Sequence, residues 1–128
     1  MAAGELEFLL VTSRKRRRWI IPKGTVREMP PHASAAREVY EEAGVLGLIS
    51  QQCAGAYRRR KDDASGEKNL IVAYPLLVDT ILPHWPEMAL RKRQWVSAPE
   101  AVALIDDEGL KNLIATFART YALADPPI

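Results

Sequence analysis

The chain has 128 residues, of which 48% are hydrophobic, and we expect it to form one domain over residues 1–128. Its net charge is only +2, and its single cysteine excludes an internal disulfide and is typical of a reducing compartment, here the cytoplasm. No apolar run is long enough to span a membrane and no signal-peptide pattern opens the sequence, so no membrane partner is expected.

The first predicted elements are two short strands joined by a basic turn. Leu6–Val11 is predicted to be a buried strand, and Trp19–Ile21 a short strand that leads into a loop at Gly24. Between them, Arg14–Arg18 holds five consecutive basic residues. Such a run indicates phosphate capture, a nucleic-acid patch, a sorting signal or simply a solvated turn.

A helix is predicted from His32 to Ala43. It follows two prolines at positions 30 and 31, which favour a helix start, and it ends before Gly44, a residue common at helix ends. Five residues are predicted to form its apolar side, between roughly 100° and 220° from Glu38: Ala33, Ala36, Val39, Tyr40 and Ala43.

Three glutamates lie on the opposite side of this helix. On a helix that turns about 100° per residue, Glu42 lies about 40° from Glu38 on one side and Glu41 about 60° on the other. Carboxylates this close repel one another unless a cation lies among them. The pattern therefore indicates a divalent metal, Mg²⁺ or Mn²⁺, and chemistry on a phosphate-rich substrate. The alternative is a solvated acidic helix face.

The second half of the chain is predicted to alternate strands and helices. Pro75 indicates a bulge or an edge in the longest strand. The predicted elements are strands at Ala54–Arg58, Asn69–Asp79 and Arg93–Ser97, a polar hairpin loop at Lys61–Lys68, and helices at Pro99–Ile105 and Asp107–Tyr121.

Two further basic runs lie in this half, Arg58–Lys61 and Arg91–Arg93. With Arg14–Arg18 they hold twelve of the eighteen lysine and arginine residues. Clustered cations in a nearly neutral chain imply local fields rather than a uniformly basic surface.

Residues 20–45 resemble the signature of the Nudix hydrolases, G-x5-E-x7-R-E-U-x-E-E-x-G-U, in which U is aliphatic. Arg37–Val45 match every specified position of its second half, and Gly24 matches the opening glycine. Two departures lie in the loop. The interval from Gly24 to Arg37 is one residue short, and Pro30 occupies the position of the early glutamate, with Glu28 nearby as a stand-in.

Three more segments are similar to the diphosphoinositol polyphosphate phosphohydrolase branch of that family: Arg18–Gly24, Trp85–Glu87 and Arg91–Trp95. The resemblance implies an α/β fold, the Nudix-type α/β/α sandwich with a mixed sheet. The family has a strand before Leu6–Val11, whereas only Met1–Glu5 precede it here. We therefore expect the sequence to start after the family's first strand. The position of that strand in the sheet would then be empty, filled by a partner chain or supplied by rearrangement.

The resemblance also implies a metal-dependent pyrophosphohydrolase that uses water to cleave a phosphoanhydride bond. Diphosphoinositol polyphosphates and dinucleoside polyphosphates are the expected substrates, because the basic clusters favour a highly anionic ligand. A general nucleotide hydrolase stays open, as does a non-catalytic module that binds polyphosphate or RNA. A homodimer is a further possible partnership.

The same resemblance assigns roles to residues. Glu38, Glu41 and Glu42 are expected to bind the metal, and Glu38, Glu41 and Arg37 to be catalytic, with Arg37 holding a glutamate in place. Glu38 is the first candidate for the general base and Glu87 the second. The expected substrate-binding residues are Arg18, Lys23, Gly24, Arg58, Arg60, Arg91 and Arg93, with Arg59 as a further candidate.

Overall fold

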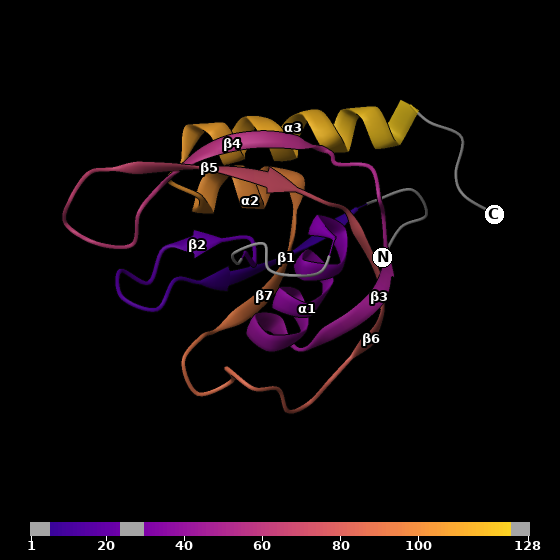
Figure 1. The fold of residues 1–128 in the computed structure, drawn as a ribbon. Coiled ribbons are helices and arrows are strands. Elements are labelled where there is room, and N and C mark those ends of the chain that lie inside the picture. Colours follow the sequence, from indigo (N-terminus) through magenta and orange to yellow (C-terminus); the bar gives the residue numbers. More distant parts are fainter. Residues whose placement is uncertain (1–5, 24–29, 124–128) are drawn as a thin grey trace.

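The structure is a computed structural model, and it describes residues 6–23 and 30–123. Gly24, Glu28 and the Met1–Glu5 segment, on which sequence-based expectations rest, lie outside these residues. The described elements are β1 (Glu7–Thr12), β2 (Trp19–Ile20), α1 (Pro31–Ala43), β3 (Val45–Ile49), β4 (Gly55–Arg60), β5 (Lys68–Ala73), β6 (Leu76–Ile81), β7 (Arg93–Ser97), α2 (Ala98–Leu104) and α3 (Glu108–Leu123) (Figure 1).

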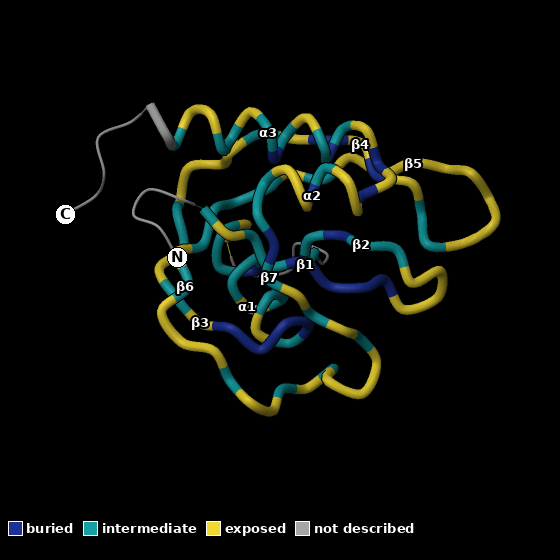
Figure 2. The backbone as a smooth tube through the Cα atoms, turned by 180° about the vertical axis from the view of Figure 1, so that it is seen from behind, coloured by how far each residue is buried: buried dark blue, intermediate teal, exposed yellow. Residues whose placement is uncertain are grey.

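A three-stranded sheet in the order β2-β1-β7 lies between two helical layers. Leu10 of β1 packs with residues of α2 and α3 in one buried cluster. Its neighbour Val11 points to the opposite face and packs with Ala43 of α1 in a second cluster. Figure 2 shows buried residues along β1, between these layers. The expected α/β/α sandwich is confirmed, although each pairing between described strands is antiparallel, whereas a mixed sheet was expected.

Two antiparallel ribbons, β3–β6 and β4–β5, complete the described strands. The prediction of one long strand from Asn69 to Asp79 is wrong, because the chain leaves one ribbon at Ala73 and enters the other at Leu76. Pro75 lies at this break, where its missing N–H removes a donor from any continuous ladder. Strand β3 was not predicted at all.

The ends of α1 and α2 follow from their sequences. Helix α1 begins with Pro31 and ends at Gly44, whose left-handed backbone (φ 67°) lets its N–H donate to the Tyr40 carbonyl oxygen over 3.0 Å. Helix α2 begins with a capping box, in which Ser97 and Glu100 each accept a hydrogen bond from the other's backbone N–H. Among the described residues, no helix is both long and apolar enough to cross a bilayer.

Candidate active site

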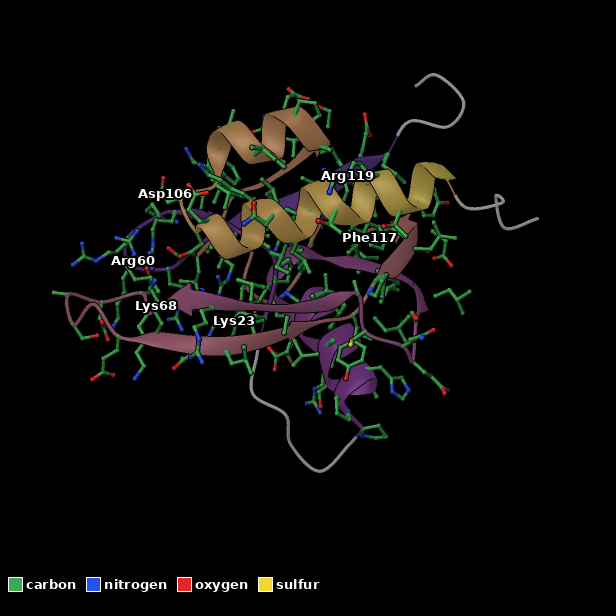
Figure 3. The ribbon with its side chains drawn as sticks, turned by 90° about the horizontal axis from the view of Figure 1, so that it is seen from above. Lys23, Arg60, Lys68, Asp106, Phe117 and Arg119 are labelled. Carbon is green, nitrogen blue, oxygen red and sulfur yellow. The ribbon has the colours of Figure 1, made fainter. Side chains whose placement is uncertain are left out.

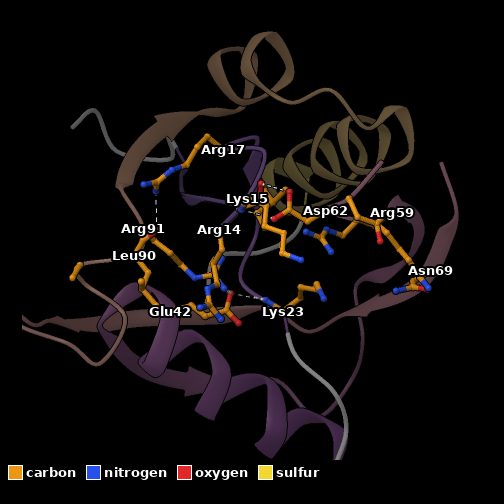
Figure 4. Close-up of a pocket in the computed structure, with 15 residues that line it drawn as sticks. Arg14, Lys15, Arg17, Lys23, Glu42, Arg59, Asp62, Asn69, Leu90 and Arg91 are labelled. Atoms are coloured by element: carbon orange, nitrogen blue, oxygen red, sulfur yellow. Dashed lines mark hydrogen bonds and ion pairs between the residues drawn. The ribbon is translucent and has the colours of Figure 1, made fainter. Parts of the chain in front are cut away.

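A cleft of about 590 Å³ opens where the β1–β2 turn, the end of α1, β4 and the loop before β7 meet (Figure 4). Seven basic residues and three acidic residues are among those that line it. The surplus of basic over acidic residues therefore favours an anionic ligand.

Glu42, in the last turn of α1, is the most deeply buried carboxylate of the cleft, with 3% of its surface exposed. Its Oε1 accepts a hydrogen bond from the Lys23 backbone N–H over 3.3 Å and lies 3.6 Å from Nη2 of Arg91. Burial raises the pKa of Glu42 to about 7, and the charges of Glu87 and Glu38 add to this effect, while Arg91 and the Lys23 amide oppose it. An additional positive charge next to Glu42 would therefore stabilise its ionised form.

Arg91 joins two of these carboxylates. Besides its contact with Glu42, its Nε donates to Oε1 of Glu87 over 3.0 Å, and its Nη1 donates to the Thr12 carbonyl oxygen over 3.2 Å. Arg91 is thus in the cleft, as a substrate-binding residue requires, and it supplies positive charge to Glu42 and Glu87.

The other motif residues lie further from the buried end of the cleft. Arg37 donates from Nε to Oε1 of Glu41 over 3.2 Å, so it does hold a glutamate, but its side chain is 60% exposed and the pair contributes little to stability. Glu38 is half-buried and its charge acts on Glu42. The Glu87 N–H donates to the Glu41 carbonyl oxygen over 3.0 Å, which ties the loop before β7 to α1.

The donor groups fit a hard divalent cation in kind, because Glu38, Glu42 and Glu87 offer carboxylate oxygens and the latter two repel each other's charge. As the side chains stand in residues 6–23 and 30–123, however, no three acidic, histidine or cysteine side chains lie close enough to enclose an ion. The structure thus gives the ligand types without a formed coordination shell.

Strand β4 separates its three arginines by face. Burial alternates along the strand: Tyr57 and Arg59 are buried, whereas Arg58 and Arg60 are exposed. Arg59 lines the cleft, while Arg60 lies beside Lys68 at the hairpin end of the β4–β5 ribbon (Figure 3). Substrate contact by Arg58 and Arg60 stays a prediction. Period-two alternation from the apolar Tyr57 is the sequence signal that could have distinguished Arg59 from its neighbours.

Lys23 also lines the cleft. Burial lowers the pKa of Lys23, and the nearby charges of Arg59 and Arg91 lower it further, although Glu42 and Glu38 act in the opposite direction. A phosphate group close to Lys23 and Arg59 would relieve this repulsion.

Two other predicted substrate-binding arginines are engaged with the protein itself. Arg18 donates from Nη2 to the carbonyl oxygens of Arg60 and Lys61, both over 2.9 Å, which ties the β1–β2 turn to the end of β4. Arg93 donates to the carbonyl oxygens of Ala43 and Leu82 over 2.8 and 2.7 Å. Its guanidinium also lies 3.9 Å from the centre of the Trp85 ring. These contacts support the fold around the cleft.

A family model described as the NUDIX domain matches residues 2–117. The chain belongs to the Nudix family. Members of this family generally use divalent metal ions. The acidic helix α1, whose sequence resembles the Nudix signature, and the cleft beside it both lie within the matched residues.

Curated relatives and solved structures agree with this assignment. The chain is 31% identical to Nudix hydrolase 21, chloroplastic, of Arabidopsis thaliana, over 89% of this chain and 58% of the relative. It is 36% identical to the Homo sapiens diphosphoinositol polyphosphate phosphohydrolase 3-beta, over 79% of this chain and 61% of the relative. This Nudix chain thus spans about three fifths of the length of the relatives it matches.

The fold resembles that of solved Nudix structures. A crystal structure of a C. elegans Ap4A hydrolase binary complex matches with a TM-score of 0.68 and 23% identity, over 94% of this chain and 90% of that one. The solution structure of the E. coli ORF135 protein matches with a TM-score of 0.66 and 19% identity, over 97% and 88%. Both likenesses concern the fold.

Proposed function

We propose that the chain is a metal-dependent pyrophosphohydrolase that cleaves a phosphoanhydride bond in a polyphosphorylated substrate by water attack at phosphorus. The observation that carries this proposal is the cleft, in which the buried Glu42 carboxylate lies among the cations of Arg91, Lys23 and Arg59. Relatives named as a diphosphoinositol polyphosphate phosphohydrolase and an Ap4A hydrolase support substrates of the diphosphoinositol polyphosphate or dinucleoside polyphosphate type.

The proposed roles of the acidic residues follow their positions in the motif. Glu38, Glu41 and Glu42 would hold Mg²⁺ or Mn²⁺, which supplies charge neutralisation at the phosphoryl group and lowers the pKa of bound water. Arg37 holds Glu41 in place. Glu38, half-buried and near Glu42, is the proposed general base, with Glu87 as the second candidate.

The basic side chains of the cleft would bind the remaining phosphates. Lys23 and Arg91 have this role in the proposal, together with the exposed cations of the β1–β2 turn. Arg fork geometry suits two phosphate oxygens at once. Gly24 is proposed as a neighbour of the substrate on the grounds of its motif position alone.

A second candidate function is a non-catalytic module that binds polyphosphate or RNA. The contact of Arg91 with Glu42 favours it, because Arg91 supplies to that carboxylate the positive charge that a metal ion would otherwise supply. The described residues contain no group of three metal-ligand side chains that would oppose this alternative.

We also infer a reducing compartment such as the cytoplasm, since Cys53, the chain's one cysteine, is exposed and free. A homodimer is supported by Leu48 and Leu77, which are 73% and 61% exposed and face each other in the β3–β6 ribbon.

The test is release of phosphate or nucleotide, with Mg²⁺ present, from a panel of diphosphoinositol polyphosphates and dinucleoside polyphosphates. We expect the wild type to turn over at least one of them, and Glu42→Gln to be slower by at least about 100-fold. The matched control is Glu7→Gln, which removes an exposed carboxylate on β1.

Absence of turnover by the wild type, or equal rates for Glu42→Gln and Glu7→Gln, would overturn the enzymatic proposal. Salt-sensitive RNA binding without turnover would then favour the second candidate.

A further inference from the structure

Arg59 is a buried cation for which the described part of the chain offers no partner. It is 4% exposed, and its Nε is buried without a hydrogen-bond acceptor among the described residues. Its guanidinium also forms none of the ion pairs found within them. Burying a charged donor in this way is unfavourable unless an acceptor arrives, and such groups are rare in folded proteins.

The position of Arg59 indicates where that acceptor comes from. Arg59 and Lys23 both line the cleft, and Figure 4 shows their side chains directed into it from different walls. The two cations repel each other, so the free protein keeps two unfavourable charges side by side. Arg91 differs from them, because Glu42 and Glu87 already neutralise it.

The acceptor should be a dianionic or trianionic group of small size. A guanidinium offers Nε and Nη donors in a fixed fork that matches two oxygens of one phosphoryl group, while the ammonium of Lys23 adds charge from another side. A neutral ligand would satisfy one donor without relieving the repulsion between the cations.

We propose that Arg59 and Lys23 form a subsite for one phosphoryl group of the substrate, next to Glu42, with Arg59 as the residue that selects it. This inference rests on the proposed function, and it adds a residue that binds a phosphoryl group by a two-donor contact. Asn69, on the paired strand β5, also lines this part of the cleft.

The test is binding of inorganic tripolyphosphate, measured by titration calorimetry with EDTA present so that no metal contributes. We expect Arg59→Gln to raise the Kd by about 10-fold to 100-fold. Arg59→Lys should recover only part of this loss, because an ammonium cannot reproduce the fork. The control is Arg119→Gln, which removes an exposed arginine on α3 and should keep the Kd within about twofold (Figure 3).

Thermal unfolding separates binding from a structural role. Because the Arg59 side chain has no hydrogen-bond or ion-pair partner within the described residues, Arg59→Gln should unfold at the same or a higher temperature than the wild type when no ligand is present. It should also lose most of the rise in unfolding temperature that tripolyphosphate causes. A lower unfolding temperature with an unchanged tripolyphosphate-induced rise would overturn the subsite. So would a wild type that does not bind tripolyphosphate, or equal Kd values for Arg59→Gln and Arg119→Gln.

The subsite and the proposed function fail in distinguishable ways. If tripolyphosphate binding depends on Arg59 but no substrate is hydrolysed, the subsite stands and the enzymatic proposal is overturned. If hydrolysis depends on Glu42 while Arg59→Gln binds and turns over substrate like Arg119→Gln, the function stands and the subsite is overturned.

Discussion

Glu42 is a buried residue with an ionisable side chain, and its burial makes the charged form unfavourable. The side chain is 3% exposed, and its pKa is raised to about 7, mainly by burial. The neighbouring charges act in both directions, since Arg91 and the Lys23 amide favour the carboxylate while Glu87 and Glu38 disfavour it. The ionised form is therefore costly in the metal-free protein, which is consistent with the proposed metal-binding role of Glu42.

The pH dependence of stability should report this cost. The folded-state pKa of Glu42, about 7, exceeds its ordinary value of 4.5, so the folded protein binds more protons between these pH values. The free energy of unfolding should therefore fall as pH rises from about 4.5 to about 7, by up to roughly 3 kcal/mol, and stay low above pH 7. Glu42→Gln should remove this part of the slope.

Urea unfolding at pH 5 and pH 8, with EDTA present, measures the effect. We expect Glu42→Gln to be more stable than the wild type at pH 8 and to differ little from it at pH 5. Parallel pH profiles for the two proteins would show that burial of Glu42 does not govern its protonation.

At the scale of elements, the end of α1 places Glu42. Gly44 adopts φ 67°, and a Cβ added to it would lie 2.8 Å from atoms of Trp85. The Trp85 Nε1–H donates to the Glu42 carbonyl oxygen over 3.0 Å, so the same indole fills the space beside the glycine and fixes the last helical turn. The motif glycine is therefore required by backbone conformation and by close packing together.

Gly44→Ala and Gly66→Ala separate these two requirements. Gly66 has φ 76°, and apart from its chain neighbours no atom of residues 6–23 and 30–123 lies within 4 Å of an added Cβ, so its substitution costs only the left-handed backbone penalty, about 1–2 kcal/mol. Gly44→Ala should destabilise by about 1–3 kcal/mol more, because the methyl group meets Trp85. Urea unfolding of both variants tests this, and equal losses would assign the glycine to backbone conformation alone.

Local signals predicted some elements well and missed others. Pro30 and Pro31 at the start of α1 and Gly44 after it predicted the helix to within one residue, and Arg93–Ser97 matches β7. Strand β3 was missed because its short apolar run around Gly47 does not distinguish a strand from other buried segments. Its partner β6 lies some thirty residues later, and an added Cβ at Gly47 would meet the Leu77 carbonyl, a long-range contact that local sequence does not reveal.

Parts of the candidate site have a signal in the sequence, either a motif or a residue periodicity. The helix periodicity grouped Glu38, Glu41 and Glu42, and strand alternation distinguishes Arg59 from its neighbours. The contact of Arg91 with Glu42 joins residues 49 positions apart, and only the folded chain brings them together. For this reason the sequence assigned Arg91 only a substrate-binding role, whereas the structure shows that it pairs with two carboxylates.

At the scale of the whole molecule, the charge is uneven. The net charge is +2, yet seven basic residues line one cleft with three acidic ones, and the β1–β2 turn contributes Arg14, Lys15 and Arg17. The Asp62 carboxylate accepts hydrogen bonds from the N–H groups of Lys15 and Arg16 over 2.7 and 3.0 Å, which holds this turn at the cleft mouth. The attraction for a polyanion is therefore local, and exposed charges supply its outer part.

Exposed charges are screened by salt, so the attraction of the substrate to the cleft should weaken as ionic strength rises. The rate of the chemical step at the buried end of the cleft, near Glu42, should change little. Raising ionic strength from about 50 to about 300 mM shortens the Debye length from about 14 Å to about 6 Å, which should raise KM several-fold with little change in kcat. Arg14→Gln, at an exposed position that lines the cleft, should lower the salt dependence of KM, whereas Arg119→Gln on α3 should leave it unchanged. Identical salt dependences for all three proteins, or a salt effect confined to kcat, would show that the basic turn does not attract the substrate.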